Sequence, residues 1–316
     1  MTIQCRESEW LTTGEYLAEF SSKAERLRIP FSGSIDLTHR CNLDCVHCYL
    51  GPRAERRTGA AEMSTGRILS LLDEITDAEC LNLLITGGDP LIREDFPVIY
   101  SHAKKNGLLV TIFTNGTLLT DRVLDLFVDL PPLEVEISIY GATAPTYEKI
   151  TRVPGSYERC FHSIERLLEK SIKVNLKTIL MTMNSHELEE MENIARKFGV
   201  RFRFDAAISP YIDGDKTPLS LRVSAEEAIE KEFSDSKRLQ SWIKFYERFK
   251  SWTLGDSLYV CGAGVTGFHI DPYGYLQPCM TTLEIRYNIS EAGFMAGWKD
   301  ITQRISNKKA PADFTC

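Results

Sequence analysis

The 316-residue sequence has no apolar run close to the length of a membrane-spanning helix, about 18 residues, so we expect no membrane span. It has no excess of positive charge either. The net charge of -7 argues against a general nucleic-acid binder, which must neutralise phosphates. Residues 1–28 mix Glu, Lys and Arg with single apolar residues, so they lack the apolar core of a secretory signal. We therefore expect a cytoplasmic protein without nucleic-acid or membrane partners.

Cysteine is the most informative residue type in this sequence. The nine cysteines are odd in number and follow no secretion signal, which indicates reduced thiols and metal ligation rather than disulfides. Cys41, Cys45 and Cys48 form a C-x3-C-x2-C run. Three thiolates at this spacing can hold three irons of a cubane iron–sulfur cluster and leave the fourth iron open for chemistry.

Two other interpretations of the three cysteines stay open. Spacings of four and three residues also match one face of a helix, where the cysteines would be small buried side chains. Asn42 and Asp44, which lie between the cysteines, disfavour that interpretation. The other alternative is a zinc site with His39 or His47 as the fourth ligand.

Short β-branched runs alternate with helical patterns between residues 33 and 206. The expected strands are Gly33–Thr38, Asn82–Thr86, Leu109–Thr114, Glu134–Ile139, Lys173–Met181 and Arg201–Ala206. The expected helices are Ser64–Ala78, Asp95–Asn106, Asp121–Asp129, Tyr157–Ser171 and Ser185–Phe198. Strands separated by helices of this length predict βαβ units and a parallel sheet. Six repeats predict an α/β fold, an open, partial (β/α)6 barrel of the TIM type.

The chain divides by composition into four regions. We expect a helical N-terminal extension over residues 1–30, the partial barrel over 31–215 and connecting helices over 216–254. The last region, residues 255–316, is richer in Gly, aromatic residues and Cys. The extension is too short to be an independent peptide-binding domain.

The unusual motifs all fall at one predicted edge of the barrel. The cysteines follow the first strand, and Gly87-Gly88-Asp89-Pro90 follows the second. Thr114-Asn115-Gly116 ends the third strand, and Ser138 lies in the fourth. Because chemistry in such barrels lies at the C-terminal ends of the strands, we expect these motifs to form one site.

A C-x3-C-x2-C motif directly after the first strand of a chain of βα repeats resembles the radical S-adenosylmethionine (radical SAM) superfamily, over roughly residues 33–210. The resemblance implies that Cys41, Cys45 and Cys48 ligate a 4Fe–4S cluster. The open iron would chelate the amino and carboxylate groups of S-adenosyl-L-methionine. An electron from the reduced cluster would split this cofactor, and the resulting 5′-deoxyadenosyl radical would abstract a substrate hydrogen.

Gly87-Gly88-Asp89-Pro90 resembles the superfamily's Gly-Gly-Glu-Pro motif, whose backbone and carboxylate receive the methionine ammonium of the cofactor. Asp89 keeps the charge of the glutamate but is one methylene shorter, so its contact would reach less far. The two glycines would let backbone approach a ligand closely. Outside this context, Gly-Asp-Pro is ordinary turn chemistry.

The resemblance implies further cofactor contacts. His47 takes the place of an aromatic residue beside the adenine, and Asn115 lies near the cofactor. Ser138 matches a strand-four serine at the ribose, although Tyr140 stands where the superfamily commonly has aspartate. Arg152 matches an arginine that pairs with the cofactor carboxylate. Without the resemblance, these residues would include a solvated histidine, an Asn-Gly turn and a surface arginine.

The C-terminal region carries a second resemblance. Cys261, Gly274 and Cys279 match the opening C-x9-15-G-x4-C of a SPASM domain, which holds auxiliary iron–sulfur clusters in enzymes that modify peptides and proteins. Downstream, only Cys316 remains, so we expect either an incomplete SPASM-like region or a native chain that continues. The three cysteines would then be partial ligands of an auxiliary cluster. The alternative is two unconnected cysteines in a β-hairpin. The remaining cysteines have no partners at useful spacing and are expected to be structural or incidental: Cys5, Cys80 and Cys160.

Two aspartates are candidates for a catalytic acid or base. Asp271 lies near the auxiliary cysteines, and Asp205 ends the sixth strand at the barrel mouth. Aspartates in such places also form turns or salt bridges. On the same strand, Arg201 and Arg203 alternate with phenylalanines, so one pair points into the barrel. An inward arginine would meet a substrate carboxylate, with Arg203 as the best candidate.

These features predict a radical SAM enzyme that matures a ribosomally synthesised peptide by a carbon–carbon or thioether cross-link or by epimerisation. Its partners would be a peptide or small-protein substrate, a separate peptide-recognition protein and a reducing partner such as flavodoxin or ferredoxin. Related architectures resemble sulfatase-maturing, cofactor-building and haem-modifying enzymes. An alternative of another class is a non-catalytic iron–sulfur electron-transfer protein or a zinc-binding protein.

Overall fold

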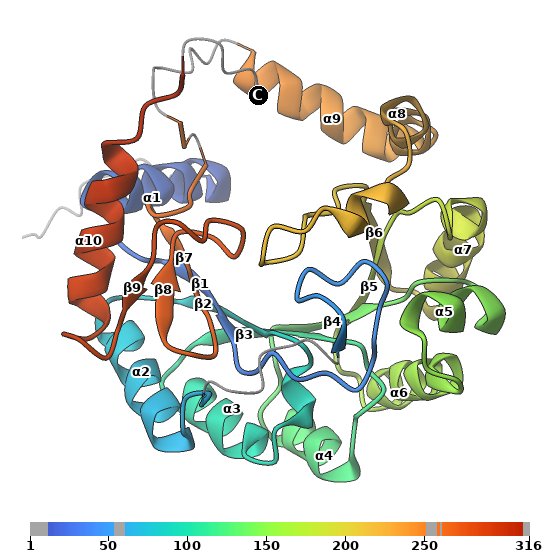
Figure 1. The fold of residues 1–316 in the computed structure, drawn as a ribbon, viewed down its shortest axis with the longest axis horizontal. Helices are drawn as coiled ribbons and strands as arrows, with labels where there is room; N and C mark the ends of the chain where they lie inside the picture. The colour runs from blue at the N-terminus through green and yellow to red at the C-terminus, as the bar shows by residue number, and fades with distance from the viewer. Residues whose placement is uncertain (1–11, 54–60, 251–257, 260, 312–316) are drawn as a thin grey trace, which may run out of the picture.

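The computed structural model describes residues 12–53, 61–250, 258–259 and 261–311. These residues form a curved sheet inside a ring of helices (Figure 1). The described strands form a nine-stranded sheet in the order β6-β5-β4-β3-β2-β1-β7-β8-β9. The strands are β1 Ser32–Asp36, β2 Asn82–Thr86, β3 Leu109–Thr114, β4 Glu134–Ser138, β5 Val174–Ile179, β6 Arg201–Asp205, β7 Gly267–Ile270, β8 Tyr275–Gln277 and β9 Tyr287–Asn288.

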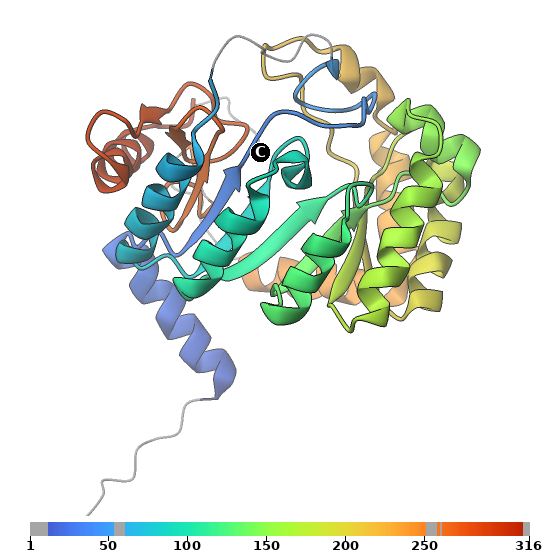
Figure 2. The same cartoon turned by 90° about the horizontal axis from the view of Figure 1, so that it is seen from below.

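Strands β1 to β7 pair in parallel, whereas β8 and β9 pair antiparallel. The helices between the first six strands lie outside the sheet (Figures 1 and 2). The helices are α1 Thr13–Leu27, α2 Thr65–Asp77, α3 Phe96–Lys105, α4 Asp121–Asp129, α5 Ala144–Thr151, α6 Ser156–Glu169, α7 Leu188–Phe198, α8 Ala225–Phe233, α9 Ser236–Phe249 and α10 Phe294–Ser306. Short 3-10 helices are η2 Pro90–Ile92, η3 Ser185–Glu187 and η4 Thr217–Leu221.

Alternation along the strands separates an apolar outer face from an inner face that carries most of the polar strand residues together with apolar ones such as Leu84 and Phe113. Ile35, Ile85 and Ile137 are at most 1% exposed and belong to the main core. Successive side chains point to opposite faces of a strand, so Ser34 and Glu136 point to the inner face. Burying one large aliphatic side chain contributes about 1.5–3 kcal/mol. The helices therefore cover the apolar outer face, and the charged and polar strand residues lie on the inner face.

The predicted partial barrel is confirmed, and β2 and β3 have the predicted bounds. The helix predicted at Ser185–Phe198 begins as the 3-10 turn η3 before α7. Helix α5 is not predicted, because eight residues with a proline near the start carry little periodic signal. The C-terminal region joins the barrel sheet through β7, which pairs with β1. None of the described helices has the length and apolar character needed to cross a membrane.

Glu187 ties the loop after β4 to the start of α5. Its carboxylate accepts hydrogen bonds from the N–H groups of Ala142 and Thr143, at 2.7 and 3.1 Å. It also accepts the hydroxyls of Thr143 and Thr146, at 2.7 and 2.5 Å. Burial raises the pKa of Glu187, but these hydrogen bonds outweigh burial and hold the pKa below its usual value.

Glu187→Gln should lower the free energy of unfolding by about 2 kcal/mol at pH 7, because hydrogen bonds to a charged group are lost. The folded-state pKa is depressed, so the stabilisation is present above the unfolded pKa of about 4.3 and is lost as pH falls through the folded pKa. Urea unfolding of both proteins at pH 7 and at lower pH measures the difference between their free energies of unfolding. This difference should become smaller as the pH falls. A difference that stays constant with pH would contradict this account.

Candidate active site

A cavity of about 410 Å³ lies at the C-terminal ends of the barrel strands. It brings together residues from all four motifs that the sequence placed at one edge. These residues are Cys41, Cys45, Cys48, Gly87, Gly88, Asn115 and Ser138. The predicted meeting of the motifs at the C-terminal ends of the strands is therefore confirmed. On the inner face of the sheet, the wall continues to Lys177, Arg203 and His269.

The cysteine loop, residues 41–48, is attached to the end of helix α5. The N–H of Asp44 donates to the carbonyl of Thr151 at 3.1 Å, and that of Val46 donates to Ile150 at 3.0 Å. These bonds satisfy backbone groups that would otherwise need water in a partly buried loop. They also use two carbonyls at the last turn of the helix, which lack helical partners. The unpredicted helix α5 thus positions the cysteines.

Asn115, at the end of β3, lies against the first cysteine. Its Nδ2 donates to the Cys41 sulfur at 3.6 Å and to Asn42 Oδ1 at 3.0 Å. Its Oδ1 accepts the N–H and hydroxyl of Thr117, which fixes the orientation of the amide. Asn115 therefore lies close to the cysteine loop, as expected for a residue near the cofactor.

The structure narrows the alternatives for the cysteines. All of residues 41–48 are described, and none of them is helical, so the helix-face interpretation is wrong. Among the described residues, no three His, Cys, Asp or Glu side chains converge closely enough to hold one metal ion. The Nε2 atom of His39, a candidate fourth zinc ligand, lies 3.4 Å from Asp36 Oδ2. Three cysteines around one cavity fit a cluster of several irons, which binds each cysteine at a different iron.

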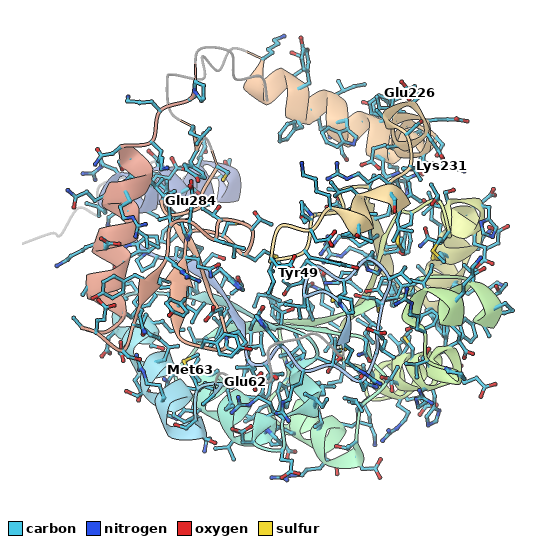
Figure 3. All side chains as sticks on the ribbon, viewed as in Figure 1. Tyr49, Glu62, Met63, Glu226, Lys231 and Glu284 are labelled. Carbon is cyan, nitrogen blue, oxygen red and sulfur yellow. The ribbon has the colours of Figure 1, made fainter. Side chains whose placement is uncertain are left out.

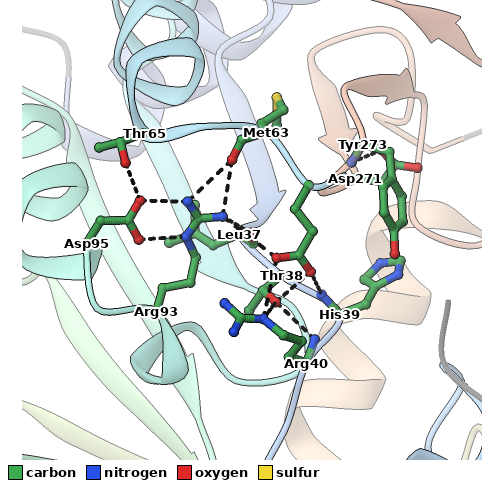
Figure 4. Close-up of polar contacts among 11 residues, drawn as sticks. Leu37, Thr38, His39, Arg40, Met63, Thr65, Arg93, Asp95, Asp271 and Tyr273 are labelled. Carbon is green, nitrogen blue, oxygen red and sulfur yellow. Dashed lines mark hydrogen bonds and ion pairs between the residues drawn. The ribbon is translucent and has the colours of Figure 1, made fainter. Parts of the chain in front are cut away.

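Glu62 and Arg93 anchor the chain where it enters the cysteine loop, and Figure 4 shows Arg93 beside Leu37 and Thr38. Glu62 Oε1 accepts the Thr38 hydroxyl at 2.6 Å and the His39 N–H at 3.0 Å. The buried Arg93 donates to the carbonyl of Leu37 at 3.0 Å. Nothing in the local sequence pattern of these two residues signals this role, because their partners come from the end of β1.

Gly87 and Gly88 let the end of β2 lie directly on residues 38–40, the segment that leads into the cysteine loop. The N–H of Gly88 donates to the Thr38 carbonyl at 2.8 Å, and that of Asp89 donates to Arg40 at 3.0 Å. A Cβ on Gly87 would lie 2.3 Å from the Thr38 oxygen, and one on Gly88 would lie 2.2 Å from the Arg40 oxygen. Gly87 also has φ +123°, which disfavours other residues. The close approach seen in the structure is thus made to residues 38–40, which lead into the cysteine loop, and an approach to a ligand stays a prediction.

Asp89 is buried and joins the ends of β2 and β3. Its Oδ1 accepts the N–H of Leu91 at 3.0 Å. Its Oδ2 accepts the Thr114 hydroxyl at 2.8 Å and the Asn115 N–H at 2.9 Å. Burial raises its pKa to about 6, against the opposing effect of these hydrogen bonds. Asp89 is not among the described residues that line the cavity, so its contact with a methionine ammonium stays a prediction.

His47 and Tyr140 form an aromatic corner of the cavity. Their ring centroids lie 4.8 Å apart in an edge-to-face arrangement. Burial lowers the pKa of His47 to about 4, which keeps the imidazole neutral at pH 7. Its buried Nδ1 has no hydrogen-bond partner among the described residues. Ser138 lines the same cavity, and both residues are placed where contact with a nucleoside is feasible.

Two other predicted residues occupy different environments. Arg152 has a side chain 55% exposed and lies 3.8 Å from Asp44. It is not among the described cavity-lining residues, and its contact with the cofactor carboxylate stays a prediction. Asp205 does line the cavity, and its Oδ1 accepts the N–H of Ala207 at 2.7 Å.

Asp271 forms the turn between β7 and β8. Its Oδ1 accepts the N–H groups of Tyr273 and Tyr275, both at 2.9 Å. Burial raises its pKa, against the opposing effect of these two hydrogen bonds. The geometry is the turn-forming alternative that the sequence allowed, and no catalytic contact is seen among the described residues.

The auxiliary cysteines lie in the C-terminal region. Cys261 is exposed and Cys279 is half-buried, with its sulfur 3.3 Å from the Thr281 hydroxyl. Met280 and Thr281, directly after Cys279, line the cavity. Cys316 lies outside the described residues. The assignment of these cysteines to an auxiliary cluster stays a prediction.

A buried polar group that the sequence did not predict lies between β1 and β7. Asp36 Oδ2 accepts the Tyr49 hydroxyl at 3.0 Å and lies 3.8 Å from His269 Nε2. His269 Nδ1 lies 2.9 Å from the Ser34 hydroxyl. Figure 3 shows Tyr49 near the centre of the molecule. The alternation of Ser34 and Asp36 indicates an inward face, but only the pairing of β1 with β7 brings His269 to it.

The fold and the site define a class: a partial (β/α) barrel with a three-cysteine iron–sulfur loop at the C-terminal ends of its strands. The model of the radical SAM superfamily matches residues 35–198, and the chain belongs to this superfamily. The resemblance inferred from the cysteine motif is therefore confirmed, and the protein is an enzyme.

Two curated relatives and one solved structure are similar over different lengths. Mycofactocin maturase MftC of Mycobacterium tuberculosis (strain ATCC 25618 / H37Rv) is 27% identical over 287 residues, 87% of this chain and 71% of the relative. PqqA peptide cyclase of Rhodopseudomonas palustris is 27% identical over 179 residues, 57% of this chain and 47% of the relative. Streptococcus suis SuiB, bound to precursor peptide SuiA, has TM-score 0.68 at 15% identity, covering 99% of this chain and 76% of SuiB. At 15% identity, the similarity to SuiB concerns the fold alone.

Membership implies a 4Fe–4S cluster and S-adenosyl-L-methionine as cofactors. The residues present fit the cluster, because three thiols from one non-helical loop line the same cavity. Cys41, Cys45 and Cys48 would hold it. When bound and reduced, the cluster supplies the electron that splits S-adenosylmethionine into methionine and a 5′-deoxyadenosyl radical. The protein contributes position and exclusion of water.

Proposed function

We propose that this enzyme modifies a peptide, and that it matures a ribosomally synthesised precursor by abstracting a hydrogen from one of its residues. The observation that carries the proposal is the cavity itself. It extends from the cysteine loop along the inner face of β4 to β6, so space for a substrate adjoins the cofactor residues. Relatives named as a maturase and as a peptide cyclase support this choice.

The residues around the cavity have separate tasks in this proposal. Asn115 orients Cys41, and Gly88 and Glu62 hold the loop that carries all three cysteines. The neutral His47 and Tyr140 would border the nucleoside, with Ser138 at the ribose. A substrate would lie against the inner strands, where exclusion of solvent limits side reactions.

The proposal extends to partners and location. Cys261, Cys279 and Cys316 would contribute to an auxiliary iron–sulfur cluster. Flavodoxin or ferredoxin would deliver the electron, and a separate small protein would recognise the precursor. With these partners, we propose that the enzyme is located in the cytoplasm. The bond formed, whether a cross-link, a thioether or an inverted centre, depends on the substrate.

The test starts from protein loaded with iron and sulfide under anaerobic conditions and then reduced. Chromatography should detect 5′-deoxyadenosine from S-adenosylmethionine, and the paramagnetic resonance spectrum of the cluster should change when S-adenosylmethionine is added. Mass spectrometry of a candidate precursor peptide then reports the modification. A loaded cluster with an unchanged spectrum and no 5′-deoxyadenosine would instead identify an electron-transfer protein. Turnover with sulfatase, cofactor or haem precursors, and none with peptides, would move the enzyme to another branch.

A further inference from the structure

Two similar groups of charged side chains lie on the inner face of β4, β5 and β6. The cavity trio consists of Glu136, Lys177 and Arg203. Arg203 donates to Glu136 Oε2 at 2.6 Å, and Lys177 Nζ lies 3.6 Å from the same oxygen. Each group combines one carboxylate with two cations.

The edge trio consists of Glu134, Lys173 and Arg201, near the opposite ends of the same strands. Arg201 and Lys173 both lie 3.0 Å from Glu134 Oε2. The trios share their chemistry but differ in location. Lys177 and Arg203 line the cavity, whereas no member of the edge trio is among the described residues that do. The edge trio is therefore a built-in control.

The strand register places the cavity trio next to the cofactor residues. Phe113 pairs with Glu136, and Lys177 Nζ lies 2.7 Å from the centre of the Phe113 ring. Asn115, which contacts Cys41, and Ser138 follow Phe113 and Glu136 by one inward-facing position each. Lys177 pairs with Ser138 and Arg203 pairs with Lys177, so both cations are level with Ser138 in the strand register, and only Glu136 lies one inward-facing position deeper.

The cavity trio has two cationic side chains and one carboxylate; Lys177 and Glu136 are largely buried, whereas the Arg203 side chain is 54% exposed. The bond to Glu136 is the only side-chain hydrogen bond of Arg203 among the described residues, which leaves the rest of its guanidinium for a ligand. Burial drives the pKa of Lys177 well below its usual value, and Arg203 adds to this while Glu136 opposes it. Asp205, also in the cavity, is engaged with its own turn at Ala207. An unbalanced buried cation is costly, and a second anion relieves that cost.

We propose that Arg203 and Lys177 bind a carboxylate of the peptide substrate and so hold the reacting residue beside the cofactor residues. The carboxylate belongs to an acidic side chain or to the peptide C-terminus. The planar guanidinium of Arg203 suits a carboxylate, because the guanidinium offers two parallel hydrogen-bond donors to the two carboxylate oxygens. This inference rests on the proposed function and adds a substrate class to it.

The test measures binding, so it does not depend on turnover. Saturation-transfer NMR on cluster-loaded protein compares two carboxylates, N-acetylglutamate α-amide and N-acetylalanine, with the neutral N-acetylglutamine α-amide. The experiment is run with and without saturating S-adenosylmethionine, because the methionine carboxylate of this cofactor is the other carboxylate that could bind Arg203 and Lys177. At least one carboxylate should bind in both conditions and the neutral amide in neither. The carboxylate that binds more tightly identifies the source as side chain or terminus.

Variants separate this site from general charge effects. Arg203→Ala should weaken carboxylate binding about tenfold or more, and Arg203→Lys should give an intermediate loss, because it keeps the charge without the fork. Arg201→Ala, in the edge trio, should bind as the wild type does. Equal binding of the neutral amide overturns the proposal, as does wild-type binding by Arg203→Ala. Carboxylate binding that disappears with S-adenosylmethionine present assigns the cations to the cofactor and also overturns it.

Discussion

Cys45→Ala will abolish the cleavage of S-adenosylmethionine. Cys45 is the middle of three thiols that line the cavity, and a cluster bound through two thiolates loses one of its iron attachments. We expect 5′-deoxyadenosine to fall to background and the iron content after reconstitution to drop markedly. Both quantities are measured on the same anaerobic preparation, by chromatography and by iron analysis.

Cys80→Ala is the matched control. Cys80 is buried just before β2, at the opposite end of that strand from Gly87, and its sulfur lies 3.5 Å from the Asn82 carbonyl. Burial raises its pKa to about 12, so it stays a thiol rather than a metal-binding thiolate. This variant should load iron and cleave the cofactor as the wild type does. Full turnover by Cys45→Ala would contradict the assignment of Cys41, Cys45 and Cys48 as the ligands of the 4Fe–4S cluster.

Gly88→Ala should push residues 39–40, and with them the cysteine loop that follows, away from the end of β2 while the barrel stays folded. The new Cβ would lie 2.2 Å from the carbonyl oxygen of Arg40 and 2.8 Å from that of His39. Both are backbone atoms, so relief requires the loop itself to shift. A displacement of about 1 Å at reacting groups can cost about 100-fold in rate. We expect a loss of that order in 5′-deoxyadenosine formation and a stability loss of about 1–3 kcal/mol.

Gly66→Ala provides the comparison for the same chemical change. Gly66 lies in helix α2, and an added Cβ there meets no atom within 4 Å. Alanine also has the higher helix propensity, so this variant should be as stable as the wild type or more so. Circular dichroism and thermal unfolding of both variants show whether Gly88→Ala keeps the fold. Normal cluster loading by Gly88→Ala would mean that the loop tolerates a shifted β2 end.

The barrel was predictable because its signals are local. Each strand is a short β-branched run and each long helix a periodic one, and the alternation of the two predicts parallel βαβ units. The exceptions had weak local signals. Helix α5 has eight residues and begins next to a proline, and its last two carbonyls hold the cysteine loop. An element that the periodic pattern did not reveal thus takes part in the site.

The direction of a polar side chain was harder to predict than its position. Asp89 follows β2 as expected, but its carboxylate accepts bonds from Thr114 and Asn115, at the end of another strand. Asp271 likewise completes its own turn. A short carboxylate takes the nearest unsatisfied N–H groups, and those are known only when neighbouring segments are in place.

By itself, the sequence determined the type of chemistry and the edge of the barrel where it occurs. Cysteine spacing is a local property, and so is the succession of strands and helices along the chain. That succession predicts a parallel sheet with Cys41, Gly87 and Asn115 at one end. Tertiary structure alone decided which distant groups complete the cavity. Ser34 and His269 are 235 positions apart and meet only because β7 pairs with β1. Such pairings depend on the packing of the whole sheet, and a local sequence pattern does not encode them.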